Sequence, residues 1–311
     1  MSEADISKSS LAHCTLCPRE CGVNRLAGEV GYCRASEKEN IRVSLVSLHP
    51  WEEPCLVGAD GRGAGTVFFS HCSLRCIFCQ NSVISNEGHG IEIPTDRLAE
   101  IFIEQQERGA ATLDLVTPTH YAPQIIEAIH ISKKRGLTLP IVWNTSGYEK
   151  KDIISGIAND VDIFLPDFKY LESEPSKIYS SAADYPKIAK AAIREMVRKK
   201  GRAIIDDAGQ MKKGVMVRHL VLPGHRKESM KIIDWLHEEF GDDIIISLMS
   251  QYTPMHGAKE HREINRRLTT FEYESVVNHA LDIGVSLCYT QERRAAGEEY
   301  VPHFDGRGVL K

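Results

Sequence analysis

Cysteines are the residues of this chain whose type and spacing most directly indicate chemistry. Seven of its nine cysteines fall into two close groups: Cys14, Cys17, Cys21 and Cys33, and then Cys72, Cys76 and Cys79. Cysteines two or three residues apart are poorly placed to bridge each other but well placed to converge on one metal ion or cluster. Disulfides are also rare in a reducing compartment. The spacing therefore predicts two metal sites.

The second group follows the first apolar, strand-like run of the chain, at 67–69. Its C-x3-C-x2-C spacing offers three thiolates in a compact turn, with no fourth cysteine nearby. Cubane iron–sulfur clusters normally bind four cysteines, so three ligands would leave one iron open. An open position is typical of a catalytic metal centre, because a group from outside the protein must complete the shell. The alternative is a structural zinc ion, or a closed cluster completed by a distant ligand such as Cys55.

Short apolar runs alternate with helical patterns from residue 67 onward, and these elements must position the cysteines. Strands are expected at 67–69, 113–116, 141–143, 163–165, 215–222, 244–248 and 285–289. Helices are expected at 95–108 (with Thr95 as N-cap), 123–134, 149–157, 186–200, 227–240 and 272–283, with an irregular stretch at 172–184. Parallel strands need crossover connections. The alternation thus predicts an α/β fold, a partial (β/α)6 barrel with its chemistry at the carboxyl ends of the strands.

Residues 1–57 fall outside this alternation. They hold the first cysteine group, a glycine-containing stretch at 22–31 and an expected strand pair around 41–48. We predict two domains, a Cys-rich N-terminal module at 1–57 and a barrel domain at 58–311.

Composition excludes several classes of function. Of 311 residues, 42% are hydrophobic and 26% are charged, as in ordinary globular proteins. The 38 basic and 43 acidic side chains give a net charge of −5, the opposite of the footprint that binding to a phosphate backbone leaves. No apolar run approaches the roughly 18–20 residues of a membrane span, and the N-terminus is too polar for a signal peptide. We therefore expect a cytosolic protein that does not span a membrane, and the charge balance argues against nucleic acid as the first candidate for its partner.

The motif at 72–79 resembles the signature of radical S-adenosylmethionine (SAM) enzymes, C-x3-C-x-aromatic-C after the first strand of a βα barrel. The resemblance extends over roughly residues 66–290. It implies that Cys72, Cys76 and Cys79 bind a catalytic [4Fe-4S] cluster and that Phe78 contacts the adenine of SAM. It also implies that the amino and carboxylate groups of SAM chelate the open iron. One electron then cleaves SAM to methionine and a 5′-deoxyadenosyl radical, which abstracts hydrogen from the substrate.

Other strand ends resemble pyruvate formate-lyase activating enzyme and its relatives. Arg218 lies in an R-x3-L-P-G segment whose arginine faces the SAM carboxylate in those enzymes, and a guanidinium fork suits a carboxylate. The segments after the third and fourth strands resemble their T-N-G and D-x-K motifs, and Gln251 follows the sixth strand. The resemblance implies a SAM and substrate cavity lined by Asn144, Ser146, Asp167, Lys169, Arg218 and Gln251. A capping or salt-bridge role is the alternative for each of them.

The segment after the second strand departs from that pattern. Activating enzymes carry Gly-Gly-Glu there, which holds the SAM amino group, whereas this chain has Val-Thr-Pro-Thr at 116–119. We expect the hydroxyls of Thr117 and Thr119, or the Thr117 carbonyl, to contact SAM instead. With the upstream cysteines, this departure makes the chain resemble the activating-enzyme homologues known as PflX.

The first cysteine group supplies four thiolates, enough to close a zinc or an iron–sulfur site. It resembles the cysteine-rich leader that precedes the barrel in the same homologues. A structural site is favoured over an auxiliary electron-relaying cluster, because auxiliary clusters of activating enzymes follow the core motif rather than precede it.

These features predict a radical SAM enzyme that forms a glycyl radical on a partner enzyme, with an electron donor such as flavodoxin or ferredoxin. A second hypothesis keeps the chemistry but makes the substrate a peptide, a cofactor precursor or an RNA base. A third, of another class, is a non-enzymatic iron–sulfur or zinc protein that serves electron transfer or assembly.

Overall fold

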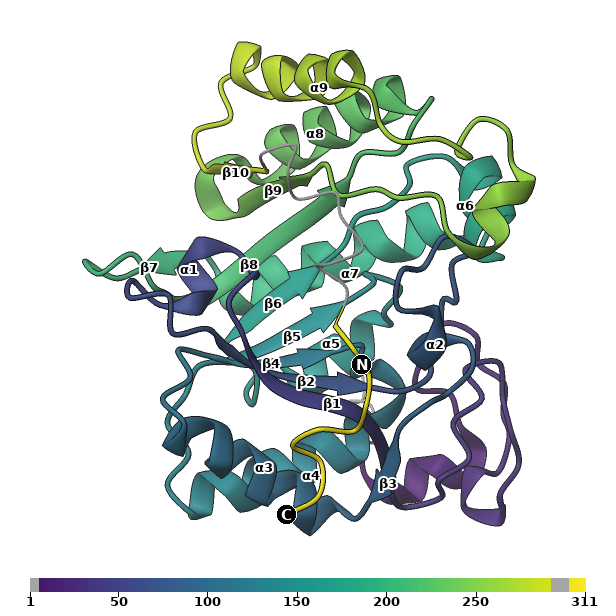
Figure 1. Cartoon of the computed structure of the whole chain (residues 1–311), viewed down its shortest axis with the longest axis vertical. Coiled ribbons are helices and arrows are strands. Elements are labelled where there is room, and N and C mark those ends of the chain that lie inside the picture. Colours follow the sequence, from purple (N-terminus) through teal and green to yellow (C-terminus); the bar gives the residue numbers. More distant parts are fainter. Residues whose placement is uncertain (1–5, 292–301) are drawn as a thin grey trace.

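The computed structural model describes residues 6–291 and 302–311 and shows an open, curved sheet with helices on its outer side (Figure 1). The strand order is β10-β9-β8-β6-β5-β4-β2-β1-β3. The parallel strands are β2 (Ala64–Phe69), β4 (Leu113–Val116), β5 (Ile141–Thr145), β6 (Ile163–Pro166), β8 (Met211–Leu220), β9 (Ile245–Met249) and β10 (Cys288–Thr290). This order confirms the predicted α/β fold, with the parallel sheet of a partial barrel.

Helices connect the parallel strands close to the predicted positions. They are α3 (Thr95–Glu107), α4 (Ala122–Lys134), α5 (Lys151–Ile157), α7 (Tyr185–Lys200), α8 (Arg226–Phe240) and α9 (Thr270–Asp282). Pro94 rather than Thr95 occupies the N-cap of α3, so the expected capping role of Thr95 is wrong. Thr269 and Glu272 form a capping box at the start of α9. The side chain of each residue accepts a hydrogen bond from the backbone N–H of the other. None of the helices within the described ranges is long and apolar enough to cross a membrane.

Strand β5 shows how the strand sequences divide the core. Its side chains alternate between the two faces of the sheet, as the pleat requires. Ile141 and Trp143 pack in the main core beneath the helices, whereas Val142 packs in a second cluster on the inner face. Asn144, two residues further on, lines a cavity on that inner face. Alternation within one strand therefore separates the residues that stabilise the fold from those that meet the cavity.

The expected strand pair around 41–48 is a single strand, β1 (Ile41–His49). It runs antiparallel to β2 and to β3 (Ile91–Ile93), so part of the first 57 residues is integral to the sheet. After β1 the short helix α1 (Pro54–Val57) enters the barrel, where Cys55 and Leu56 join the inner-face cluster. The turn that precedes α1 thus brings this helix to the inner face of the sheet, next to the cavity.

Two further elements differ from the sequence-based expectation. The stretch at 172–184 contains helix α6 (Ser173–Ser180), although it was expected to be irregular. Its serine, glutamate and proline content is typical of loops, but Pro175 lies in the first turn, where a missing N–H costs no hydrogen bond. A short strand, β7 (Ile204–Ile205), pairs antiparallel with β8. The remaining short helices are α2 (Ser82–Ser85) and 3-10 turns at 8–13, 25–27, 119–121, 241–243 and 256–260.

Candidate active site

A cavity of about 540 Å³ opens on the inner face of the sheet. That volume lies within the roughly 300–1,000 Å³ typical of small-ligand sites. The cavity brings together most of the residues that were predicted to form a site. Those that line it are Cys72, Cys76, Phe78, Cys79, Thr117, Asn144, Ser146, Asp167, Lys169, Arg218 and Gln251.

The loop that carries the three cysteines follows β2 and turns back on itself. Each of the three sulfurs accepts a hydrogen bond from a different donor. Cys72 Sγ accepts from the N–H of Leu74 at 3.3 Å, and Cys79 Sγ accepts from the Ser85 hydroxyl at 3.3 Å. Cys76 Sγ accepts from Ser180 Oγ, at the end of α6, at 3.0 Å. Donors aimed at sulfur stabilise the thiolate form, which is the form that binds metal.

Burial raises the pKa of the Cys76 thiol to about 12, although the charge of Lys169 and the Ser180 hydrogen bond act in the opposite direction. Burial also raises the pKa of the Cys72 thiol. Metal binding to these cysteines must therefore displace protons. Across residues 6–291 and 302–311, no three His, Cys, Asp or Glu side chains are grouped so as to hold one metal ion. A cubane cluster has a different requirement, because each cysteine binds a separate iron atom.

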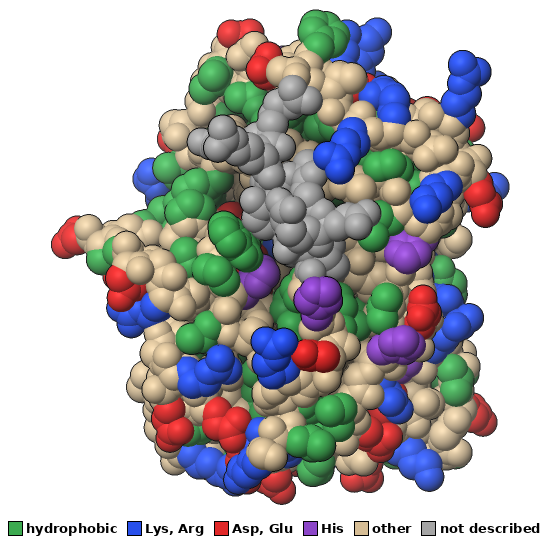
Figure 2. Space-filling model, in the orientation of Figure 1, with side chains coloured by type: hydrophobic (Ala, Val, Ile, Leu, Met, Phe, Trp, Pro, Cys, Tyr) green, Lys and Arg blue, Asp and Glu red, His purple; other side chains and the backbone are tan. Residues whose placement is uncertain are grey.

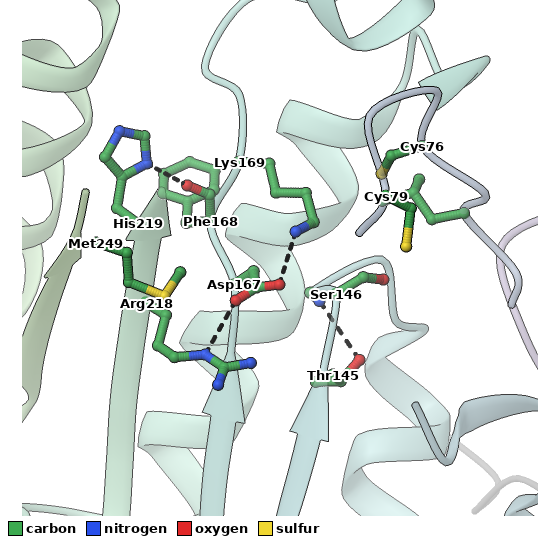
Figure 3. Close-up of polar contacts among 12 residues, drawn as sticks. Cys76, Cys79, Thr145, Ser146, Asp167, Phe168, Lys169, Arg218, His219 and Met249 are labelled. Atoms are coloured by element: carbon green, nitrogen blue, oxygen red, sulfur yellow. Dashed lines mark hydrogen bonds and ion pairs between the residues drawn. The ribbon is translucent and has the colours of Figure 1, made fainter. Parts of the chain in front are cut away.

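An ionic network lines the cavity beside the loop that carries Cys76 and Cys79 (Figure 3). Lys169 Nζ donates to Asp167 Oδ2 at 2.7 Å, and Arg218 Nε donates to Asp167 Oδ1 at 3.1 Å. Arg218 also donates to Asn144 Oδ1 at 2.5 Å and to Glu52 Oε2 at 3.4 Å. Burial opposes ionisation of Asp167, but Lys169 and Arg218 hold the pKa of its carboxyl below the usual value. The parallel strands β5, β6 and β8 thus bring one buried set of charges to the cavity.

The Arg218 side chain was expected to face the SAM carboxylate, and the structure shows that its guanidinium already has three protein partners. Burial lowers the pKa of Arg218, but the surrounding carboxylates, led by Asp167, raise it well above its usual value. Lys169 lies nearer the cysteines, since its charge acts on both Cys76 and Cys72. The cavity therefore contains two cationic side chains at different positions, Lys169 nearer the cysteines and Arg218 among the carboxylates.

Three acidic residues of this network were not indicated by the motifs. Glu52 and Glu53 precede α1 and line the cavity, and Asp114 Oδ2 accepts from Asn144 Nδ2 at 3.2 Å. Burial raises the pKa of Glu53 to about 6 and raises that of Asp114 well above its usual value. Two features of the sequence could have indicated these residues: a carboxylate inside the apolar run 113–116 and an acidic pair after β1. Neither lies at the carboxyl end of a parallel strand, where the site of such a sheet is expected.

The two threonines expected to contact SAM lie in different surroundings. Thr117 lines the cavity with a left-handed backbone (φ 60°), and its N–H donates to the carbonyl of Asn144 at 2.8 Å. Thr119 does not line the cavity. It is buried, and its hydroxyl donates to Glu149 Oε1 at 2.5 Å. The turn at Thr117 directs the following chain away from the cavity, so Thr119 has a hydrogen-bonding role in the core.

Aromatic side chains form another part of the cavity wall. Phe78 is buried, and its ring packs edge-on against Tyr179 and Tyr252 at centroid distances of 6.3 and 5.8 Å. Tyr252 follows Gln251 in the loop after β9 and also lines the cavity. The aromatic of the cysteine motif is therefore fixed by contacts from two distant segments.

The N-terminal cysteines lie outside the cavity lining, in the segment near α2 in Figure 1. Backbone hydrogen bonds link Cys14 to Val23 and to Gly22, which folds the segment back on itself. Burial is the largest cause that raises the pKa of the Cys17 thiol to about 12, and the charges of Cys33, Cys14 and Cys21 contribute to the same shift. The four thiols therefore lie in one region, with Cys21 exposed, but in the described residues no three of them are grouped so as to hold one metal ion.

Figure 2 shows lysine and arginine side chains interspersed with aspartate and glutamate over the face that it draws. This mixed surface agrees with the net charge of −5.

Comparison with known proteins identifies relatives of the chain. Residues 66–240 match the family model of the Radical SAM superfamily. Uncharacterized protein MJ0674 of Methanocaldococcus jannaschii is 30% identical over 300 residues, which cover 92% of this chain and 80% of that protein.

Among solved structures, Streptococcus suis SuiB bound to S-adenosylmethionine has 13% identity and a TM-score of 0.49, covering 71% of this chain and 48% of SuiB. SuiB bound to the precursor peptide SuiA has 14% identity and a TM-score of 0.49, covering 71% of this chain and 46% of SuiB. The chain thus spans about half the length of SuiB. The family match covers more than half of the chain, and the protein therefore belongs to the radical SAM superfamily, whose enzymes use a [4Fe-4S] cluster and SAM.

Proposed function

We propose that Cys72, Cys76 and Cys79 bind the [4Fe-4S] cluster and that the adjoining cavity binds SAM and the substrate. The observation that carries this proposal is the position of the three sulfurs, each with a hydrogen-bond donor, at the wall of a cavity of about 540 Å³. Among the described residues, no fourth cysteine lines that cavity. The donor set therefore fits a cluster with one iron left for a ligand from outside the protein.

When bound, the cluster supplies one electron that cleaves SAM to methionine and a 5′-deoxyadenosyl radical, which removes hydrogen from the substrate. The residues of the chain hold and orient the reactants. Lys169 and Arg218 offer positive charge to a carboxylate, whereas Glu52 and Asp167 offer negative charge to an ammonium or a sulfonium. A cavity with both signs of charge suits SAM, which carries all three groups.

Neutral side chains complete the SAM site in this proposal. Phe78 offers an aromatic edge to the adenine, and the amides of Asn144 and Gln251 offer both donors and acceptors. Ser146 and Thr117 add hydroxyl groups at the ends of β5 and β4. Edge-on contacts with Tyr179 and Tyr252 hold the Phe78 ring in place at this side of the cavity.

We infer further that the hydrogen donor is a glycine of a partner protein, as the resemblance to pyruvate formate-lyase activating enzyme implies. The likeness of the β8 segment around Arg218 to R-x3-L-P-G supports this choice. The turn at Thr117, which replaces Gly-Gly-Glu, favours the second candidate, modification of a peptide, a cofactor precursor or RNA. An electron donor such as flavodoxin or ferredoxin belongs to either proposal, and nine free thiols suit a reducing, cytosolic compartment.

The first experiment measures 5′-deoxyadenosine formed from SAM by the anaerobically reconstituted protein with dithionite. The matched control replaces all three of Cys72, Cys76 and Cys79 by alanine. We expect product only from the parent protein. Absence of product from protein that carries a full cluster would instead support the non-enzymatic hypothesis.

The same triple variant tests the N-terminal cysteines, for which we propose a structural zinc or iron–sulfur site. Any metal that the triple variant retains must be bound at a site other than the cysteine triplet. Removing Cys14 and Cys33 as well should release that metal, and its identity, zinc or iron with sulfide, distinguishes the two kinds of site. Retention of the metal would contradict the assignment.

The partner is tested by electron paramagnetic resonance. A glycyl radical signal on a co-purified large enzyme, dependent on SAM and on Cys76, would support activation. SAM cleavage that is stimulated by a peptide or RNA, with no such signal on any candidate enzyme, would favour the second candidate.

A further inference from the structure

One arginine of the N-terminal region contacts the loop that carries the cysteine triplet. Arg19 lies between Cys17 and Cys21, and its Nε donates to the carbonyl of Ser73 at 3.0 Å. Its Nη2 donates to the carbonyl of Leu74 at 3.5 Å. Ser73 and Leu74 lie between Cys72 and Cys76, so the guanidinium holds the backbone of the cluster-binding loop itself.

The same guanidinium binds the end of α6. Arg19 Nη2 donates to the carbonyl of Ser180 at 3.0 Å, and Nη1 donates to the carbonyl of Ser181 at 2.5 Å. The last carbonyls of a helix have no partner within the helix, and a cation there complements the helix dipole. Arg19 therefore joins two segments that lie about a hundred residues apart in the sequence.

The end of α6 contacts the cluster-binding loop directly. The Ser180 hydroxyl donates to Cys76 Sγ at 3.0 Å, and Tyr170 OH lies 2.8 Å from the same hydroxyl oxygen. The N–H of Ile77, next to Cys76, donates to the carbonyl of Tyr179 at 2.9 Å. The segment that Arg19 holds is thus the one that supplies a hydrogen bond to a cluster ligand.

A tyrosine next to another N-terminal cysteine fixes the guanidinium. The Arg19 Cζ lies 3.8 Å from the centroid of the Tyr32 ring, and Tyr32 directly precedes Cys33. Tyr32 OH also donates to the carbonyl of Leu74, at 3.5 Å. Because Arg19 and Tyr32 each adjoin cysteines of the first group, the fold of that group determines where both side chains lie.

We propose that the N-terminal cysteine region positions the cluster-binding loop, with Arg19 as the positioning residue that holds the loop against the end of α6. This inference rests on the proposed cluster at Cys72, Cys76 and Cys79. Hydrogen bonds to cluster sulfurs influence the reduction potential, and a donor stabilises the more negative, reduced state. Arg19 therefore affects the electron-accepting property of the cluster without contacting it.

The test compares Arg19→Lys with Lys150→Ala in the full chain, reconstituted anaerobically. Lysine keeps the charge but lacks the planar fork that reaches several carbonyls. Lys150 Nζ pairs with Glu20 Oε1 at 2.8 Å, so it joins the same N-terminal region to the barrel without contacting the cluster-binding loop. We expect Arg19→Lys to lose iron to a chelator several-fold faster than the parent and to shift the cluster potential to a more negative value. Lys150→Ala should match the parent in both measurements.

Ser180→Ala separates the hydrogen bond from the placement of the loop. It should shift the potential in the same direction as Arg19→Lys, with iron retention close to that of the parent. The inference is overturned if Arg19→Lys behaves as the parent, or if Lys150→Ala has equal effects. A parent protein that takes up no cluster would instead contradict the proposed function.

Discussion

The two cysteine groups of this chain differ in what surrounds their sulfurs. Cys72, Cys76 and Cys79 line a cavity together with Lys169 and other charged side chains. The N-terminal group lines no part of that cavity and supplies four thiols rather than three. Its segment packs instead against the outside of the cluster-binding loop, through Arg19.

The comparison shows that an adjoining space and an incomplete ligand set, rather than cysteines as such, indicate where a cluster can meet a small molecule. Four thiols can complete the coordination of a metal, which leaves a stabilising role. Three thiols beside charged groups leave a coordination position and a place for the ligand that fills it. The two groups should therefore respond differently when a thiol is removed.

The largest effect is expected for Cys76→Ala. Without one of three ligands the cluster should not form, so SAM cleavage should fall by at least about a thousandfold, the scale seen when an essential group is lost. The fold should remain intact, because Cys76 lies in a loop. Product formation measured beside thermal unfolding checks both expectations. Substantial residual cleavage would mean that another group can complete the site.

The opposite pattern is expected for Cys33→Ser. Loss of one ligand from a closed metal site should remove much of the roughly 10 kcal/mol that a structural metal can contribute to folding. Limited proteolysis and the melting temperature should therefore change before catalysis does. Cys288→Ser is the control, since Cys288 lies on β10 away from both groups. Equal unfolding of the two variants would remove the basis of the comparison.

The cysteine triplet could be predicted from the sequence because its ligands are neighbours in the chain. The shared position of Asn144, Asp167 and Arg218 could be predicted as well, since parallel strands present their carboxyl ends to one edge. The acidic residue Asp114 was hidden within a strand. Its role depends on which face of the pleat it occupies and on the side chain of the next strand.

Contacts between distant segments were beyond local patterns. Ser180 reaches Cys76 only because α6 forms in a stretch whose composition is typical of loops. Arg19 has no local signal at all, since its partners are backbone carbonyls of two remote segments. Thr119 shows the converse case, because a left-handed turn at Thr117 moves it away from the site that its position indicated.

Arg218→Met tests the charged side of the comparison. Arg218 is the partner of Asp167 and Glu52, and removal of one member of a buried ion pair costs about 3–5 kcal/mol. Urea unfolding of the protein should show this loss. Arg194→Met is the matched control, because the pair between Arg194 and Glu239 is exposed and should be worth about 1 kcal/mol or less. Similar losses in both variants would show that the cavity network is not buried in solution.

The smallest expected effect is a change in stability with pH that depends on His120. This residue lies between the N-terminal region and the strand end that precedes the cysteine triplet. Its Nε2 donates to the carbonyl of Ser70 at 2.8 Å, and its own carbonyl accepts from Arg25 of the N-terminal region at 2.5 Å. Burial lowers the pKa of His120 to about 3, and the charge of Arg25 acts in the same direction. Between pH 6.5 and 3 the unfolded chain therefore binds one more proton than the folded chain at this residue.

Stability should accordingly fall as the pH decreases through that window, by roughly 1.4 kcal/mol per pH unit from His120. Urea unfolding at pH 6.5 and pH 5 should show a loss of about 2 kcal/mol that His120→Gln abolishes, since glutamine can still donate to Ser70. An unchanged slope in His120→Gln would mean that His120 takes up a proton in the folded state as it does in the unfolded chain, which would contradict its burial beside Arg25.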